Sequence, residues 1–247
     1  MSVSIRNSLA LGGVALVALA CLALLEHPAS GEDLRAAIPA NAAGDLCASG
    51  QQQSPVDLGR AVPASAGLPA MKWKSAHGGM VVNTGHTIEV DVEGAGGVTI
   101  EGIAYGLKQV RFHHPSEHTI SGKRFAMEAQ LVHAAADGKL AVIGVLFEEG
   151  AANPALDPVW ATAPGREGKA AVAFQIDPAK LVGAMTSAYR YEGSLTTPPC
   201  SETVTWVVLA QPITASRSQI AAFAAMFPNN ARPVQPLNRR YVLKTSD

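Results

Sequence analysis

Residues 111–123 read RFHHPSEHTISGK, and they continue a strand-like run that begins at residue 107. Successive side chains of a strand point to opposite faces of a sheet. One face of the predicted strand 107–114 is therefore polar and carries Gln109, Arg111 and His113. Val110, Phe112 and His114 lie on the opposite face.

A second predicted strand, 126–133, shows the same alternation. Glu128 and Gln130 share one face, whereas Leu131 and His133 share the other. Buried polar groups require hydrogen-bonding partners. The pattern thus predicts that the two polar faces meet in a pocket, and it leaves open a solvated sheet face as the alternative.

The rest of the chain is also strand-like, with Gly and Pro between short apolar runs. Further strands are predicted over 81–83, 87–92, 98–100 and 140–147. Helices are few: Asp177 caps one over 179–185, and Ser216 caps one that includes residues 220–227. These elements predict one mainly antiparallel β domain with short helices.

The composition is that of an ordinary globular protein. The chain has 247 residues, of which 48% are hydrophobic, and its net charge is −1. This charge provides no electrostatic basis for binding nucleic acid.

The first 25 residues differ from the remainder of the chain. Arg6 precedes an apolar run over residues 9–25, which is typical of a secretory signal peptide or an uncleaved anchor. Residues 26–46 read as a linker, and residues 47–245 as the domain. We expect a periplasmic or secreted protein, or one anchored in the inner membrane by residues 9–25 alone.

Two cysteines, Cys47 and Cys200, remain outside the apolar run. An even number of cysteines in an exported chain predicts a disulfide bond. The alternative is a pair of free buried thiols.

Five segments resemble the α-class carbonic anhydrases, and they occur in that family's order. They are QSPVDL from Gln53, NTGHTIEV from Asn83, RFHHPSEHTISGK from Arg111, GSLTTPPCSETVTW from Gly193 and RPVQPLNRR from Arg232. The resemblance implies a single domain around a twisted, ten-stranded, mostly antiparallel sheet. It also implies a conical cleft with three histidines that bind a catalytic zinc ion for CO₂ hydration.

This chain departs from the family at the zinc ligands. The first and third histidine positions correspond to Arg111 and Gln130, and only His113 is retained. Arginine has no lone pair to donate to a metal, and glutamine is a poor zinc ligand. We therefore expect no ordinary zinc site, as in the acatalytic carbonic-anhydrase-related members. His114 and His133 should face away, and His118 matches a structural position.

Other family positions are retained. His86 matches the proton shuttle, Thr196 matches the hydroxyl that accepts the zinc hydroxide's hydrogen bond, and Glu117 matches the carboxylate that orients this hydroxyl. The substrate pocket of the family corresponds to Val132, Val142, Leu195, Thr197 and Trp206. An exposed loop position for His86 and core positions for the apolar residues are the simpler interpretations.

The losses at the metal position also suggest a replacement. Gln109 and Glu128 match residues that support the metal-binding histidines from behind. Without zinc, Glu128 needs another cation, and we expect Arg111 to pair with it.

Three functions remain open on this basis. The leading hypothesis is a non-enzymatic exported protein, without a cofactor, that binds a small anion such as bicarbonate at Arg111, His113, Gln130 and Thr196, or binds a protein partner. The alternative is an active carbonate dehydratase with an atypical zinc site. A scaffold or storage protein that keeps only the fold is the third.

Overall fold

The computed structural model describes residues 46–65, 67–77 and 79–246. The predicted signal peptide or anchor and linker residues 26–45 lie outside this part of the chain. Within it, no helix is both long enough and apolar enough to cross a membrane.

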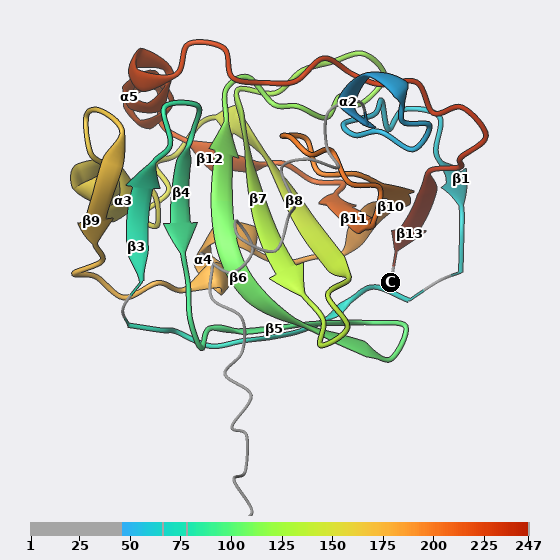
Figure 1. Cartoon of the computed structure of the whole chain (residues 1–247), viewed down its shortest axis with the longest axis horizontal. Helices are drawn as coiled ribbons and strands as arrows, with labels where there is room; N and C mark the ends of the chain where they lie inside the picture. Colours follow the sequence, from blue (N-terminus) through green and yellow to red (C-terminus); the bar gives the residue numbers. More distant parts are fainter. Residues whose placement is uncertain (1–45, 66, 78, 247) are drawn as a thin grey trace, which may run out of the picture.

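A 13-stranded sheet dominates the described residues (Figure 1). The strands are β1 (Val62–Pro63), β2 (Ala70–Trp73), β3 (Met80–Asn83), β4 (Ile88–Asp91), β5 (Gly96–Ile100), β6 (Ile103–His113), β7 (Met127–Ala134), β8 (Leu140–Glu149), β9 (Gly168–Ala171), β10 (Ser187–Gly193), β11 (Val204–Leu209), β12 (Ile213–Ala215) and β13 (Leu243–Ser246). Ten of them follow one path, in the order β1-β13-β10-β11-β8-β7-β6-β4-β3-β9. Most neighbours are antiparallel, but β11 pairs with β8 in parallel. The predicted mainly β fold with short helices is confirmed.

Strands β6, β7 and β8 form the centre of the sheet. Strand β6 lies between β4 and β7 and runs antiparallel to both. Arg111 is therefore opposite Glu89 on β4 and opposite Gln130 on β7. His113 is opposite Glu128. Since residues directly opposite one another share a face, the register collects these five side chains on one side of the sheet.

The two faces of the central strands pack into separate cores. Alternate residues such as Phe112, Leu131 and Ile143 belong to the larger core. The intervening apolar residues, including Val142 and Trp206, belong to a second one. This alternation follows from the period of two along a strand, and both faces are buried.

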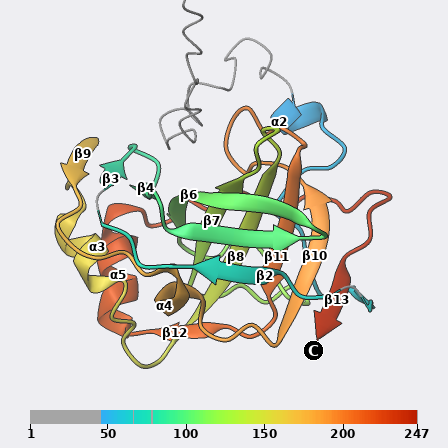
Figure 2. The ribbon, with the colours of Figure 1, turned by 90° about the horizontal axis from the view of Figure 1, so that it is seen from below.

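In the described part of the chain, four short helices lie around the sheet: α2 (Leu46–Ser49), α3 (Asp157–Thr162), α4 (Pro178–Val182) and α5 (Arg217–Met226). Figures 1 and 2 place α3 and α5 beside β3 and β9, at the far end of the sheet from β13.

The two predicted helix caps are present. The Asp177 side chain accepts a hydrogen bond from the backbone N–H of Ala179, and Ser216 forms a capping box with Gln219. Helix α4 is shorter than predicted because Gly183 follows it with a φ of 67° and ends the helix.

The predicted disulfide bond is confirmed. It joins Cys47 in α2 to Cys200, across 153 residues of sequence. The Arg232 guanidinium donates a 2.7 Å hydrogen bond to the Cys47 carbonyl oxygen, so α2 is held against the domain at two points.

Candidate functional site

Arg111 is held by its neighbours on both sides. Its Nε atom lies 2.5 Å from Oε1 of Gln109 and 3.2 Å from Oε1 of Glu89. One terminal nitrogen donates a 3.1 Å hydrogen bond to the Thr197 hydroxyl. The other terminal nitrogen makes no hydrogen bond to the residues that the structure describes. With 14% of its side chain exposed, Arg111 connects the buried polar face to the surface.

The expected pairing of Arg111 with Glu128 is wrong. Glu128 lies two positions before Gln130 on β7 and is therefore opposite His113. Glu89 lies directly opposite Arg111 on β4. Strand alternation identifies the shared face but not which neighbouring strand supplies the partner.

Glu128 has a full set of other partners. Its Oε2 accepts hydrogen bonds from the backbone N–H groups of Glu117 and His118, at 3.0 and 2.9 Å. Its Oε1 lies 2.8 Å from Nδ1 of His118. Burial raises the pKa of Glu128, but attraction to His118 and these hydrogen bonds outweigh burial and hold it below the usual value. No additional cation is needed.

His118 is a structural residue, as its family position suggested. Its Nε2 lies 2.7 Å from the hydroxyl of Tyr191, which donates a 2.9 Å hydrogen bond to Ser54. Burial raises the pKa of Tyr191 well above its usual value. This buried series of hydrogen bonds holds His118 in place, and His118 in turn fixes the orientation of the Glu128 carboxylate.

Two carboxylates on β4 belong to the site and were missed by sequence reasoning. The Gln109 side-chain amide donates to Oε2 of Glu89 at 3.1 Å and to Oδ1 of Asp91 at 2.7 Å. Both carboxylates are buried. Glu89 and Asp91 are alternate residues of a predicted strand, and two acids on one face of a core strand were a usable signal.

His113 carries an unsatisfied nitrogen. Its residue is 2% exposed, and its Nδ1 lies 3.3 Å from the carbonyl oxygen of Asn230 and 3.5 Å from Oε1 of Glu117. Both neighbours accept hydrogen bonds, so Nδ1 carries the hydrogen. The Nε2 atom is buried and has no hydrogen-bond partner among the residues that the structure describes. Such atoms are rare in folded proteins and require an explanation.

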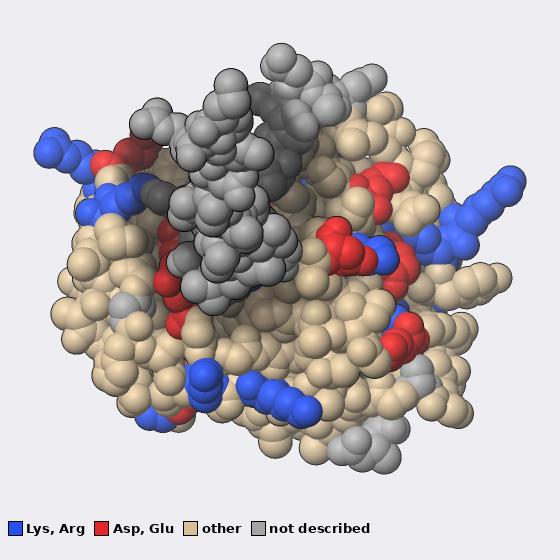
Figure 3. Space-filling view, turned by 60° about the horizontal axis from the view of Figure 1, so that its bottom comes forward, with Lys and Arg blue, Asp and Glu red and all other residues tan. Residues whose placement is uncertain are grey.

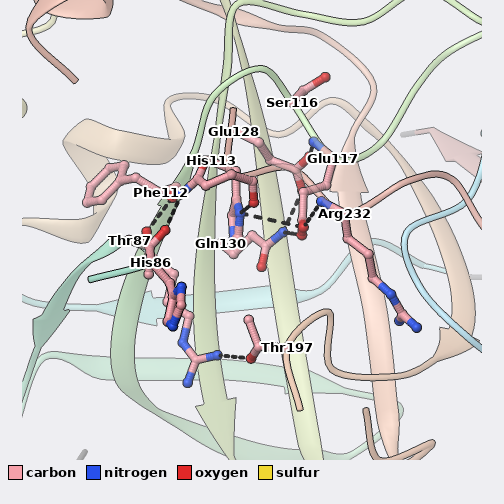
Figure 4. A network of polar contacts seen from close by, with 12 residues as sticks. His86, Thr87, Phe112, His113, Ser116, Glu117, Glu128, Gln130, Thr197 and Arg232 are labelled. Carbon is pink, nitrogen blue, oxygen red and sulfur yellow. Dashed lines mark hydrogen bonds and ion pairs between the residues drawn. The ribbon is translucent and has the colours of Figure 1, made fainter. Parts of the chain in front are cut away.

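Gln130 bridges two carboxylates. Its Nε2 donates to Oε2 of Glu117 at 2.7 Å and to Oε1 of Glu128 at 3.2 Å. These bonds use both amide hydrogens, which fixes the orientation of the amide. In Figure 4, the amide oxygen of Gln130 points away from the carboxylates and toward the side of the site where Thr197 lies.

Glu117 and Thr196 are not joined. The second oxygen of Glu117 accepts a 2.8 Å hydrogen bond from the backbone N–H of Arg232 (Figure 4). Thr196 is buried, and it makes no hydrogen bond to Glu117 among the described residues. Gln130 therefore binds the Glu117 carboxylate, which in the family pattern accepts the hydrogen bond of the threonine hydroxyl.

His86 lies on the exposed turn between β3 and β4. Its carbonyl oxygen accepts a 3.0 Å hydrogen bond from the Asn230 side chain, which also donates to the Phe112 carbonyl oxygen. Asn230 therefore ties the His86 turn to the strand of His113 and was missed by sequence reasoning.

The predicted apolar pocket residues lie close together in the second core. Four of them are buried: Val132, Val142, Leu195 and Trp206. The indole N–H of Trp206 donates to the Ser194 carbonyl oxygen at 2.9 Å. Only Thr197 of the predicted pocket set is half-buried, and it holds Arg111.

Residues 41–246 match the family model described as eukaryotic-type carbonic anhydrase. The chain belongs to this family. A carbonic anhydrase of Pectobacterium carotovorum is 40% identical over 200 residues, which cover 80% of this chain and 82% of the relative.

Solved structures of the carbonic anhydrase fold agree with this assignment. The α-carbonic anhydrase of Thermovibrio ammonificans, in complex with the inhibitor sulfanilamide, is 41% identical, with a TM-score of 0.78 over 86% of this chain and 94% of that one. A dioscorin complexed with ascorbate is 34% identical, with a TM-score of 0.76 over 82% and 89% of the two chains.

The zinc ion that this family implies does not fit the three side chains at its expected position. Arg111 presents only N–H donors, and the Gln130 amide nitrogen is bound to two carboxylates. His113 alone offers a lone pair on a ring nitrogen. Among the described residues, no three His, Cys, Asp or Glu side chains are grouped so that they could hold a metal ion.

Proposed function

We propose that this protein is a carbonic anhydrase homologue that does not use zinc and instead binds a small oxyanion, such as bicarbonate, beside Arg111. The buried, unpartnered Nε2 of His113 is the observation that carries the proposal. A buried nitrogen without a partner is costly unless a ligand or a water molecule pairs with it.

The groups around His113 suit a small polar ligand. Arg111 has one terminal nitrogen available, and guanidinium groups bind planar oxyanions well. The hydroxyls of Thr196 and Thr197 lie on the adjoining loop. Because Glu89 already compensates the charge of Arg111, we expect modest affinity, set by hydrogen bonds more than by net charge.

The wider molecule supports a small ligand over a highly charged polymer. On the face shown in Figure 3, acidic and basic residues are interspersed, with no extended patch of one sign outside the grey atoms. A family neighbour, dioscorin, has been solved with ascorbate, which is an organic anion at neutral pH.

Titration calorimetry with bicarbonate tests the proposal. We expect binding by the wild-type protein and at least about a tenfold loss in Arg111→Ala, because a charge-assisted hydrogen bond is removed. Arg60→Ala, at an exposed arginine, is the matched control and should leave binding unchanged. Absence of bicarbonate heat in the wild-type protein, or equal affinity in Arg111→Ala, would overturn the proposal.

The second candidate is an active carbonate dehydratase with an atypical metal site. It is favoured by the 40% identity to proteins named carbonic anhydrase. Metal analysis after mild purification, combined with a CO₂ hydration assay, separates the two candidates. Stoichiometric zinc with activity would replace our proposal, whereas we expect neither.

We further infer that the protein is exported, to the periplasm or beyond, or is held at the inner membrane by residues 9–25. The disulfide bond supports an oxidising compartment. Fractionation of cells that express the full chain, with an antibody to the domain, tests this inference. Recovery in the cytosol would contradict it.

A further inference from the structure

The hydrogen-bonding groups at the site are arranged asymmetrically. Both amide hydrogens of Gln130 are committed to Glu117 and Glu128, so its Oε1 can act only as an acceptor. This oxygen makes no hydrogen bond to the residues that the structure describes.

His113 adds a second acceptor on the same side. Since its Nδ1 faces the Asn230 carbonyl oxygen and the Glu117 carboxylate, the neutral ring carries its hydrogen there. The free lone pair is then on Nε2, which is buried and unpartnered. Gln130 and His113 thus present acceptors, not donors, to a ligand.

Donors are found on the other side of the same site. Arg111 is directly opposite Gln130 across the two strands and is two positions before His113 on its own strand. Its second terminal nitrogen, which makes no hydrogen bond to the described residues, can only donate. The hydroxyl of Thr197, which accepts from Arg111, has its own hydrogen left to donate.

The geometry points to a ligand class within the function proposed above, on which this inference rests: an oxyanion that also carries a hydroxyl group. Its charged oxygen faces Arg111 and Thr197, and its O–H faces both acceptors, Gln130 Oε1 and His113 Nε2, which share its hydrogen. A simple oxyanion of the same shape would leave Nε2 unpaired and would set its own oxygen against the Gln130 carbonyl. Bicarbonate and α-hydroxy acids meet the requirement, whereas nitrate and acetate do not.

Two matched pairs of probes test the inference by titration calorimetry or competition. Glycolate and acetate differ by one hydroxyl, and bicarbonate and nitrate are both planar monoanions of which only bicarbonate has an O–H. We expect glycolate to bind about five- to tenfold more tightly than acetate, and bicarbonate to bind more tightly than nitrate by a similar factor.

The outcomes separate this inference from the proposed function. If all four anions bind but the members of each pair bind equally, the hydroxyl requirement is overturned and oxyanion binding stands. If none binds, both are overturned.

Two variants identify the groups responsible. Arg111→Ala should weaken glycolate and acetate about equally and preserve their ratio. Gln130→Leu removes an acceptor, so the ratio should fall to about half or less of its wild-type value. An unchanged ratio in a folded Gln130→Leu protein would contradict the assignment. If that variant does not fold, a ratio that collapses in Arg111→Ala would contradict it equally.

Discussion

The central sheet holds two buried histidines on opposite faces, and their surroundings differ in one respect. His133 is fully buried, its Nε2 accepts a 3.2 Å hydrogen bond from the Trp73 indole, and its Nδ1 donates to the Leu131 carbonyl oxygen at 2.8 Å. His113 is almost as buried, yet within the described part of the chain only its Nδ1 has a partner.

The difference separates a structural histidine from one that awaits a ligand. Both ring nitrogens of His133 are satisfied within the protein, so nothing further is required of it. His113 is almost as buried, but its Nε2 has no partner among the residues that the structure describes, so a ligand can supply one. Burial alone does not distinguish the two roles, whereas a count of hydrogen bonds does.

The largest expected effect comes from restoring histidines at the two zinc-ligand positions that Arg111 and Gln130 now occupy, because His113 would then gain a metal ion as its partner. In Arg111→His/Gln130→His, three imidazoles would face one point, and we expect stoichiometric zinc binding. Tight zinc binding is worth about 10 kcal/mol or more. The double variant also releases a Glu117 oxygen for Thr196, so we expect measurable CO₂ hydration. Metal analysis and a CO₂ hydration assay measure the two effects.

Each single variant is a control, because it supplies only two imidazoles and should bind zinc weakly. A double variant that folds but takes up no zinc would show that the three positions do not converge. Zinc without activity would place the remaining defect at Thr196, Glu117 or the shape of the pocket.

The second prediction concerns His133 and pH. Burial lowers its pKa from 6.5 to about 4. The unfolded chain therefore binds a proton at a higher pH than the folded one, and stability should fall as the pH is lowered from about 6.5 to about 4. The loss attributable to this residue is about 3 kcal/mol at most. Denaturant unfolding at several pH values measures it.

His133→Gln is the matched control for this pH dependence. Its amide can accept from Trp73 and donate to the Leu131 carbonyl oxygen, but it does not titrate. The slope of stability against pH between about 6.5 and 4 should become shallower in this variant, whatever its stability at neutral pH. An unchanged slope would assign the pH dependence to other groups.

The sequence alone predicts which face of the sheet carries each of the two histidines. Alternation along β6 and β7 placed Arg111, His113 and Gln130 on one face and His133 on the other, because the period of a strand is two. The β6–β7 pairing is regular from Gln109 onward, and its register shift falls between Leu107 and Gln109. The helix caps at Asp177 and Ser216 were equally local signals.

Contacts set by strand order were not accessible. Arg111 has neighbours on both β4 and β7, and only the topology shows that Glu89 is its partner. Asn230 and Arg232 contact the site from a segment that lies more than 100 residues after β6 in the sequence. No periodic pattern in that segment predicts these contacts. Nor does the sequence show that the Glu117 carboxylate accepts its hydrogen bond from Gln130 and not from Thr196.

The smallest expected effect is a difference in the free energy of unfolding between a leucine variant at His133 and one at His113. His133→Leu would leave the Trp73 indole N–H without its acceptor, and we expect a loss of about 2 kcal/mol in the free energy of unfolding. His113→Leu removes one long hydrogen bond but also removes a buried unsatisfied nitrogen, so its cost should stay within about 1 kcal/mol. Denaturant unfolding of both variants at neutral pH, without added anions, measures the difference. Equal costs would mean that His113 Nε2 is already satisfied in solution, and the basis for a ligand at this site would then be lost.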